Sequence, residues 1–218
     1  MNKRLPGLSG NQLKIIALVT MTLDHIGMML LPQFPILRII GRISFPIFAW
    51  LIAEGCRHTR DRKRYLTTMA GFAGICQSVY TLATGSLYLS ALVSFTIAIC
   101  LIYLFDRCTC VCCNSTALWA AVAVFQGVML LCWYLPQLAP GTDLGLDYGF
   151  CGILLPCLAY LYQTRRNQLI FFGFGLILLS LPILALYNGQ RGKRKMKYLF
   201  YVYYPAHLVA IYLLSLIL

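Results

Sequence analysis

The sequence predicts an all-α membrane protein, built as a polytopic bundle of about eight transmembrane helices. Of its 218 residues, 60% are hydrophobic and only 11% are charged, whereas about 25% of residues are charged in a typical soluble domain. The mean hydropathy is +0.76. Apolar runs of about 20 residues, the length that crosses the hydrocarbon core of a bilayer, recur along the whole chain.

The predicted spans follow from these apolar runs, taken in order. They cover 11–31, 36–54, 65–84, 86–105, 117–135, 146–163, 168–187 and 198–217. Prolines and glycines mark several of the turns between them. No soluble domain or long linker fits between the runs, so we expect one integral-membrane domain over residues 1–218.

The net charge of +12 is distributed as in a membrane protein. Basic residues cluster between the apolar runs, which is typical of cytoplasmic loops, so we expect a lipid bilayer around the chain and no nucleic-acid partner. The basic head at 1–10 has no small-residue cleavage site, and we expect no cleaved signal peptide.

Orientation follows from the loops that carry this charge. Lys3 and Arg4 precede the first run, and "RHTRDRKR" (57–64) follows the second. Counting spans places both on one side, so we expect a bacterial cytoplasmic membrane protein with both termini in the cytoplasm. Loop 188–197 breaks the pattern. Seven predicted spans precede it, so counting places its five basic residues on the side of the membrane opposite to the cytoplasm. Either the count is wrong by one helix, or this loop is basic for a functional reason.

The chain has ten cysteines, and four of them form the segment "CTCVCC" (108–113). Such a cluster could bind a soft metal ion. It lacks the separated pairs of a zinc ribbon and has no histidine near it in sequence. We therefore favour a reduced or lipidated loop and predict no metal.

Charged residues inside the apolar runs are the main functional signal, because each costs about 2.5–3.5 kcal/mol near the bilayer centre. Asp24 and His25 lie six or seven residues from the end of the first run, roughly 10 Å deep. Arg42 lies six residues into the second run, at about the same depth, and Arg38 is on its face one turn earlier. We expect Asp24 or a bound anion to lie between the two arginines.

Polar residues near the ends of other runs complete the candidate site. They are Asp147, Tyr148, Asn188, Arg191, Tyr204 and His207. Structural interpretations also stay open: Asp24 could pair with Arg42 for stability alone, and His207 could be a satisfied core histidine. Tyr203 and Tyr204 could lie in an interfacial aromatic belt, and the arginines could extend towards the membrane surface.

These residue types suit two kinds of chemistry. A histidine can take a proton from an amine or hydroxyl, a nearby carboxylate can orient it, and arginines can hold an anion or a developing oxyanion. Together they suit acyl transfer. A proton-coupled transporter would need the same groups as a proton relay, and a structural component of a surface-assembly machine is a third alternative.

Several separated motifs resemble the TraX family of bacterial membrane proteins. They are "LKIIALVTMTLDHIG" (13–27), "LRIIGRISFPIFAWLIAEG" (37–55), "HTR" (58–60), "DYG" (147–149), "YNGQRG" (187–192) and "YLFYVYYPAHL" (198–208). The family is named after an enzyme that acetylates the N terminus of conjugative pilin. It is also similar to multi-pass acyltransferases that modify cell-surface sugars.

This resemblance implies acetyl-CoA as the donor, with a pilin N terminus or a surface glycan as the acceptor outside the cytoplasm. It also implies that His25 is the catalytic base, surrounded by Asp24, Arg38, Arg42 and His207. Because acetyl-CoA is cytoplasmic and such acceptors are not, a site inside the membrane would join the two.

Overall fold

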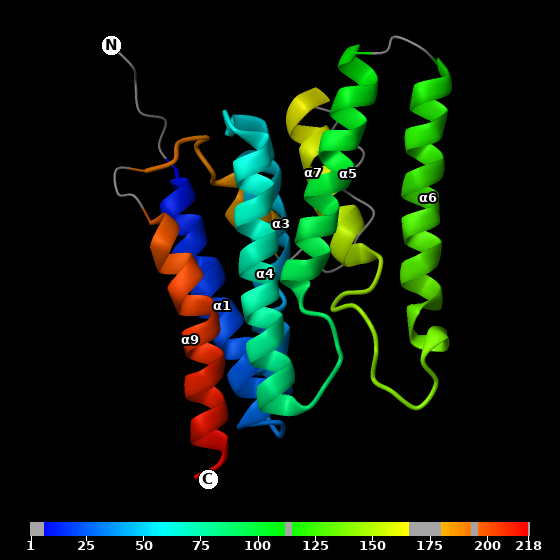
Figure 1. Ribbon diagram of the computed structural model, residues 1–218. Helices are drawn as coiled ribbons and strands as arrows, with labels where there is room; N and C mark the ends of the chain where they lie inside the picture. The colour runs from blue at the N-terminus through cyan, green and yellow to red at the C-terminus, as the bar shows by residue number, and fades with distance from the viewer. Residues whose placement is uncertain (1–6, 112–114, 166–179, 193–195, 218) are drawn as a thin grey trace. The chain divides into compact units, whose positions relative to one another are not determined.

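The computed structural model describes residues 7–111, 115–165, 180–192 and 196–217, and Figure 1 shows their arrangement as helices. Within these ranges the regular secondary structure is helical, with two isolated β-bridges, which confirms the predicted fold class. The helices are α1 (Gly10–Met29), α2 (Pro35–Gly41), α3 (Ser44–His58), α4 (Arg62–Thr84), α5 (Ala91–Val111), α6 (Ser115–Leu138), α7 (Cys151–Arg165), α8 (Leu181–Ala185) and α9 (Lys197–Ser215).

Among the described residues, three stretches are long and apolar enough to cross a membrane: Pro35–His58, Ala91–Cys108 and Trp119–Leu138. Two shorter apolar helices cover Cys151–Leu161 and Leu199–Ser215. Helices also form over the predicted spans 11–31 and 65–84, but these carry more polar residues. The predicted span 168–187 lies largely outside the described residues, and its described end contains the short α8.

The chain forms two compact units, residues 1–51 with 168–218 and residues 52–167. In the first unit, α1 and α2 run antiparallel with their backbones in close contact. Gly27 lies against Leu37, and Gly41 lies against Asp24. A side chain at either glycine would collide with the facing helix, so the two glycines set the spacing of this pair.

The predicted second span is interrupted at Arg42, between α2 and α3. Pro46 explains the break, because its ring has no N–H for the carbonyl of Arg42 four residues earlier and clashes with that carbonyl. The hydroxyl of Ser44 donates to the carbonyl of Gly41 at 2.7 Å and closes the turn. Arg42 therefore lies at a helix end and not in the middle of a continuous helix.

The helices α1 and α9 run parallel and side by side (Figure 1). Thr22 contacts Tyr203, and His25 contacts His207 about one turn further along both helices. The two chains therefore run in the same direction. If both helices cross the membrane, an odd number of crossings must connect the start of α1 to the end of α9.

The described first part of the basic loop, residues 188–192, lies at the same end of the first unit as the start of α1. The backbone N–H of Leu8 donates to Leu186 at 2.6 Å, and that of Gly10 donates to Gln190 at 2.7 Å. The N–H of Asn188 donates in turn to Leu8 at 2.9 Å. This differs from the expectation from counting spans, which placed loop 188–197 on the opposite side from the N-terminus.

Three helices of the second unit are linked by one carboxylate near the end of α5. Oδ2 of Asp106 accepts a hydrogen bond from Nη2 of Arg62 at 2.6 Å and from the hydroxyl of Tyr160 at 2.7 Å. Asp106 thus links α4, α5 and α7. The guanidinium of Arg62 also lies 5.2 Å from the ring centre of Tyr103, a distance suited to cation–π attraction.

At the other end of this unit, two loops are joined through Leu89. Its N–H donates to Gly145 at 2.7 Å, and its carbonyl accepts from Asp147 at 2.8 Å. α7 then begins at Cys151, five residues later than the predicted span starting at 146. The helix α6 packs on α5 through Phe125 and Phe105, whose ring centres are 5.9 Å apart.

Candidate functional site

Two histidines from opposite ends of the sequence meet inside the first unit. Nε2 of His207 lies 3.0 Å from Nδ1 of His25, a hydrogen-bond distance, and the ring centroids are 5.0 Å apart. His207 is buried, with 7% of its surface exposed. Its Nδ1 lies 2.9 Å from the carbonyl oxygen of Tyr203. The predicted proximity of His25 and His207 is therefore present in the structure.

An acid and two arginines lie beside this pair. Oδ1 of Asp24 is 3.6 Å from Nε of Arg38, an ion-pair distance that is too long for a hydrogen bond. Arg42 is also close enough to attract Asp24 electrostatically. Oδ1 of Asp24 is buried and has no hydrogen-bond partner among the described residues. Asp24 therefore lies within the electrostatic reach of both arginines, as expected, and Arg42 has the larger effect on its carboxylate.

Two residues of this site, Thr22 and Tyr203, were not predicted as functional. Their hydroxyl oxygens are 2.6 Å apart. The ring of Tyr203 also stacks on His207, with centroids 5.3 Å apart and an interplanar angle of 13°. The sequence does contain a signal for them, because each lies one helical turn before a histidine and on the same face.

Tyr204 also contacts this cluster. Its ring meets the edge of His207, with centroids 5.6 Å apart at 79°, and 8% of its surface is exposed. Tyr204 therefore lines the histidine site.

Asn188 and Arg191 lie in the basic loop at the start of α1. The side-chain amide of Asn188 donates to the carbonyl of Gly7 at 3.2 Å, and its oxygen accepts from the N–H of Gln190 at 3.0 Å. Arg191 lies beside Gly10 and close enough to Lys14 for their charges to interact. Along α1, Gly10 is roughly 22 Å from His25, so these residues do not contact the histidines.

Asp147 and Tyr148 belong to the second unit. The carbonyl of Asp147 accepts from the hydroxyl of Ser94 at 3.4 Å. Tyr148 has a φ of +61°, the one positive value at a non-glycine residue in the described part of the chain. Such a φ is rare for a bulky side chain and stores strain that often marks functional positions.

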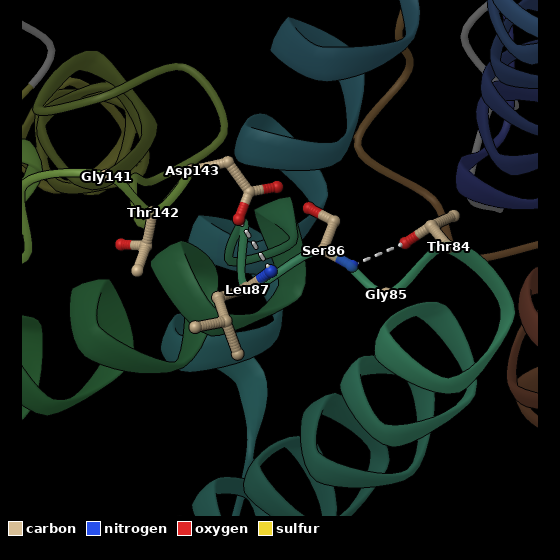
Figure 2. Close-up of a pocket in the computed structure, with 7 residues that line it drawn as sticks. All are labelled: Thr84, Gly85, Ser86, Leu87, Gly141, Thr142 and Asp143. Atoms are coloured by element: carbon tan, nitrogen blue, oxygen red, sulfur yellow. Dashed lines mark hydrogen bonds between the residues drawn. The ribbon is translucent and has the colours of Figure 1, made fainter.

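The second unit also has an open polar pocket between two loops (Figure 2). Its volume is about 450 Å³, and it is lined by Thr84, Gly85, Ser86, Leu87, Gly141, Thr142 and Asp143. Oδ1 of Asp143 accepts from the N–H of Leu87 at 2.9 Å. Hydrogen bonds from Ser86 and Leu87 to the ionised carboxylate lower the pKa of Asp143.

The cysteine cluster at 108–113 lies partly outside the described residues, and the prediction about it stays a prediction. Elsewhere in the described part of the chain, no group of three or more histidine, cysteine or acidic side chains is arranged to hold a metal ion.

Comparison with known proteins covers nearly the whole chain. A probable fimbrial assembly protein FimC, serogroup H1, of Dichelobacter nodosus is 25% identical over 248 aligned positions, covering 92% of this chain and 93% of that protein. An uncharacterized protein of Rickettsia prowazekii is 27% identical over 159 positions, covering 72% of this chain and 57% of that protein. No solved structure matches. The family model described as TraX protein matches residues 9–215, and the chain belongs to the TraX family of membrane proteins.

Proposed function

We propose that this protein is a membrane-embedded acetyltransferase that transfers an acetyl group from acetyl-CoA to an amine or hydroxyl of an acceptor outside the cytoplasm. The observation that carries the proposal is the hydrogen-bonded pair of His25 and His207 within the apolar part of the chain. An imidazole held in this way can act as a general base.

In this reaction His25 takes a proton from the acceptor as its nitrogen or oxygen attacks the thioester carbonyl. The carbon–sulfur bond then breaks, the acetyl group stays on the acceptor, and the CoA thiolate is protonated. Negative charge develops on the carbonyl oxygen during the attack, and Arg38 and Arg42 are the nearby cations suited to stabilise it. Asp24 neutralises part of their charge while the site is empty.

The donor would enter from the end of α1 at which the basic loop lies. The first unit has ten basic residues, and Asp24 is its one acidic residue, so phosphates are attracted to Lys14, Arg191 and their neighbours. Lys14 is eleven residues before His25, about 16 Å along the helix. The phosphates and thioester of acetyl-CoA lie at opposite ends of a long molecule, which suits this separation.

The positive-inside rule supports a cytoplasmic location for that end, in a bacterial inner or plasma membrane. On this orientation the start of α1 and loop 188–197 are cytoplasmic, where acetyl-CoA is made. The fimbrial assembly name of one relative favours a pilus subunit or a surface glycan as the acceptor.

The same name favours a second candidate function, a structural component of a fimbrial assembly machine. Such a component has no need for acetyl-CoA. A proton-coupled transporter could also use the two histidines, and it too has no reason to bind acetyl-CoA. Thermal stabilisation of the purified protein by acetyl-CoA, but not by acetate, therefore separates the enzyme from both alternatives.

The direct test is transfer of labelled acetyl from acetyl-CoA to membrane extracts or to a hydroxyl- or amine-bearing acceptor. We expect His25→Ala to reduce transfer by about 10²–10⁴-fold, the usual effect of losing a general base. His58→Ala is the matched control, because His58 is the remaining histidine of the chain and lies 3.6 Å from Glu54 in the other unit. Full transfer by folded His25→Ala protein would contradict the catalytic role.

Arg42→Lys tests the anion-binding part of the proposal. Lysine keeps the charge but lacks the planar fork of arginine, so a two-pronged contact with an oxyanion or phosphate is lost. We expect transfer to fall by about tenfold or more, from a lost charge-assisted contact of about 1.5–3 kcal/mol. Unchanged transfer would limit Arg42 to a structural role beside Asp24.

A further inference from the structure

The hydrogen-bond partners of His207 determine which of its nitrogens carries the proton. Nδ1 lies 2.9 Å from the carbonyl oxygen of Tyr203, and a carbonyl can only accept a hydrogen bond. Nδ1 must therefore be the N–H donor. In a neutral imidazole the other nitrogen then has a lone pair, so Nε2 of His207 is an acceptor. Because His207 is buried among aromatic rings, the neutral form is favoured.

This assignment carries over to His25. The acceptor Nε2 of His207 faces Nδ1 of His25 at 3.0 Å, so Nδ1 of His25 must be the donor. His25 is thereby held in the tautomer with its proton on Nδ1, and its lone pair is on Nε2. The backbone carbonyl of Met21, one helical turn earlier on α1, also accepts a hydrogen bond from the ring of His25. The basic atom of the pair is the ring nitrogen that points away from His207.

The ring of His207 is itself fixed by Tyr203 and Thr22. The hydroxyl of Thr22 lies 2.9 Å from the carbonyl of Leu18 and must donate its single proton there. The hydroxyl of Tyr203, at 2.6 Å, is therefore the donor to Thr22. Tyr203 thus anchors its hydroxyl to α1, while its carbonyl and its stacked ring both hold His207.

We propose that His207 serves as a fixed hydrogen-bond acceptor that sets the tautomer of His25, and that Tyr203 and Thr22 are positioning residues for His207. The proposal deepens the acetyltransferase function and rests on it for the role of Nε2. The tautomer itself follows from the geometry alone. His207 then carries no proton between substrates, and His25 acts through Nε2.

Nitrogen-15 NMR of protein labelled only at histidine tests the tautomer directly. The chain has three histidines, so the single variants at 25, 58 and 207 assign every signal. We expect the proton of His25 on Nδ1 and a lone-pair shift at Nε2. A proton on Nε2 of His25 would overturn the proposal. This result does not depend on enzymatic activity, so it distinguishes a wrong tautomer from a wrong proposed function.

Two substitutions of His207 separate an acceptor from a proton carrier. The side-chain oxygen of His207→Gln can still accept from Nδ1 of His25, but glutamine cannot carry a proton, and His207→Leu can do neither. We expect the glutamine variant to keep transfer within about tenfold of wild type and the leucine variant to lose about 10²–10⁴-fold. Equal loss in both, at wild-type Tm, would show that His207 carries protons itself.

The positioning role of the hydrogen bond between Tyr203 and Thr22 is tested by Tyr203→Phe and Thr22→Val. Each removes the same hydrogen bond, so each should reduce transfer about two- to tenfold, and the double variant should be no worse than either single one. Tyr212→Phe, on the same helix but away from the histidines, is the matched control and should leave transfer unchanged. Additive losses, or no loss at all, would remove Tyr203 and Thr22 from the positioning role.

Discussion

Gly41 is the position at which the smallest change should disturb the site most. A methyl group added there would lie 2.6 Å from Cα of Asp24 and 2.8 Å from its backbone nitrogen. Carbon atoms in normal contact are about 3.5 Å apart, so Gly41→Ala must push α1 and α2 apart by about 1 Å. The neighbour is backbone and cannot rotate away.

This displacement should have two measurable effects. Overpacking of this kind costs about 1–3 kcal/mol, which corresponds to a fall in Tm of about 2–12 °C for a chain of this length. Asp24 and His25 would move with the α1 backbone, and a misplacement of about 1 Å can cost about 10²-fold in rate. We therefore expect acetyl transfer to fall more steeply than Tm.

The assay is Tm in detergent together with transfer from labelled acetyl-CoA. The matched controls are Gly74→Ala in α4 and Gly127→Ala in α6, because a Cβ at either glycine has no neighbour within 4 Å. Alanine also favours a helix over glycine, so both controls should keep or raise Tm. If Gly41→Ala has the Tm and activity of wild type, the close packing of α1 on α2 does not hold the site.

Three further predictions follow from other contacts. A cysteine introduced in loop 188–192 and one placed just before α1 should be labelled from the same side of the membrane. A cysteine placed after α9 should be labelled from the opposite side. Labelling of all three from one side would contradict the parallel arrangement of α1 and α9. Asp106→Asn should lower Tm through loss of its ion pair, whereas the exposed Asp61→Asn should lower it less. Folding lowers the pKa of Asp143, so its ionised carboxylate stabilises the contact with the N–H of Leu87. This stabilisation is complete above the usual pKa of aspartate. It is lost as the pH falls through the lowered pKa. Hydrogen exchange at the amide of Leu87 should show this extra acid sensitivity in wild type and not in Asp143→Asn.

The fold class and the two halves of the site could be predicted from the sequence because both depend on local signals. Long apolar runs have few alternatives to membrane helices, and Asp24 and His25 stand out because charge is costly there. The proximity of Asp24 to both arginines was also predictable, because Arg38 and Arg42 are one helical turn apart on the helix that follows. The break at Arg42 was less predictable, although Pro46 was its signal.

For the side of the membrane on which loop 188–197 lies, the charge of the loop was a better guide than the number of predicted spans before it. An error in any span reverses the predicted side of every later loop, whereas the positive-inside rule applies to each loop separately. The five basic residues of loop 188–197 already indicated the side on which the structure places its described part, next to the start of α1. The strained φ of Tyr148 could not be predicted, because it depends on how the neighbouring loops meet.

The contact between His25 and His207 joins residues 182 positions apart in the chain, and this has a consequence for biosynthesis. At about 5–20 residues per second, His25 is made roughly 10–40 s before its partner. During that interval α1 can be inserted into the membrane with an unmatched histidine and an unmatched threonine on one face. The nascent chain therefore has no histidine pair until its last helix is inserted. If the proposed function is correct, we expect a chain truncated before α9 to be inserted into the membrane but to transfer no acetyl group.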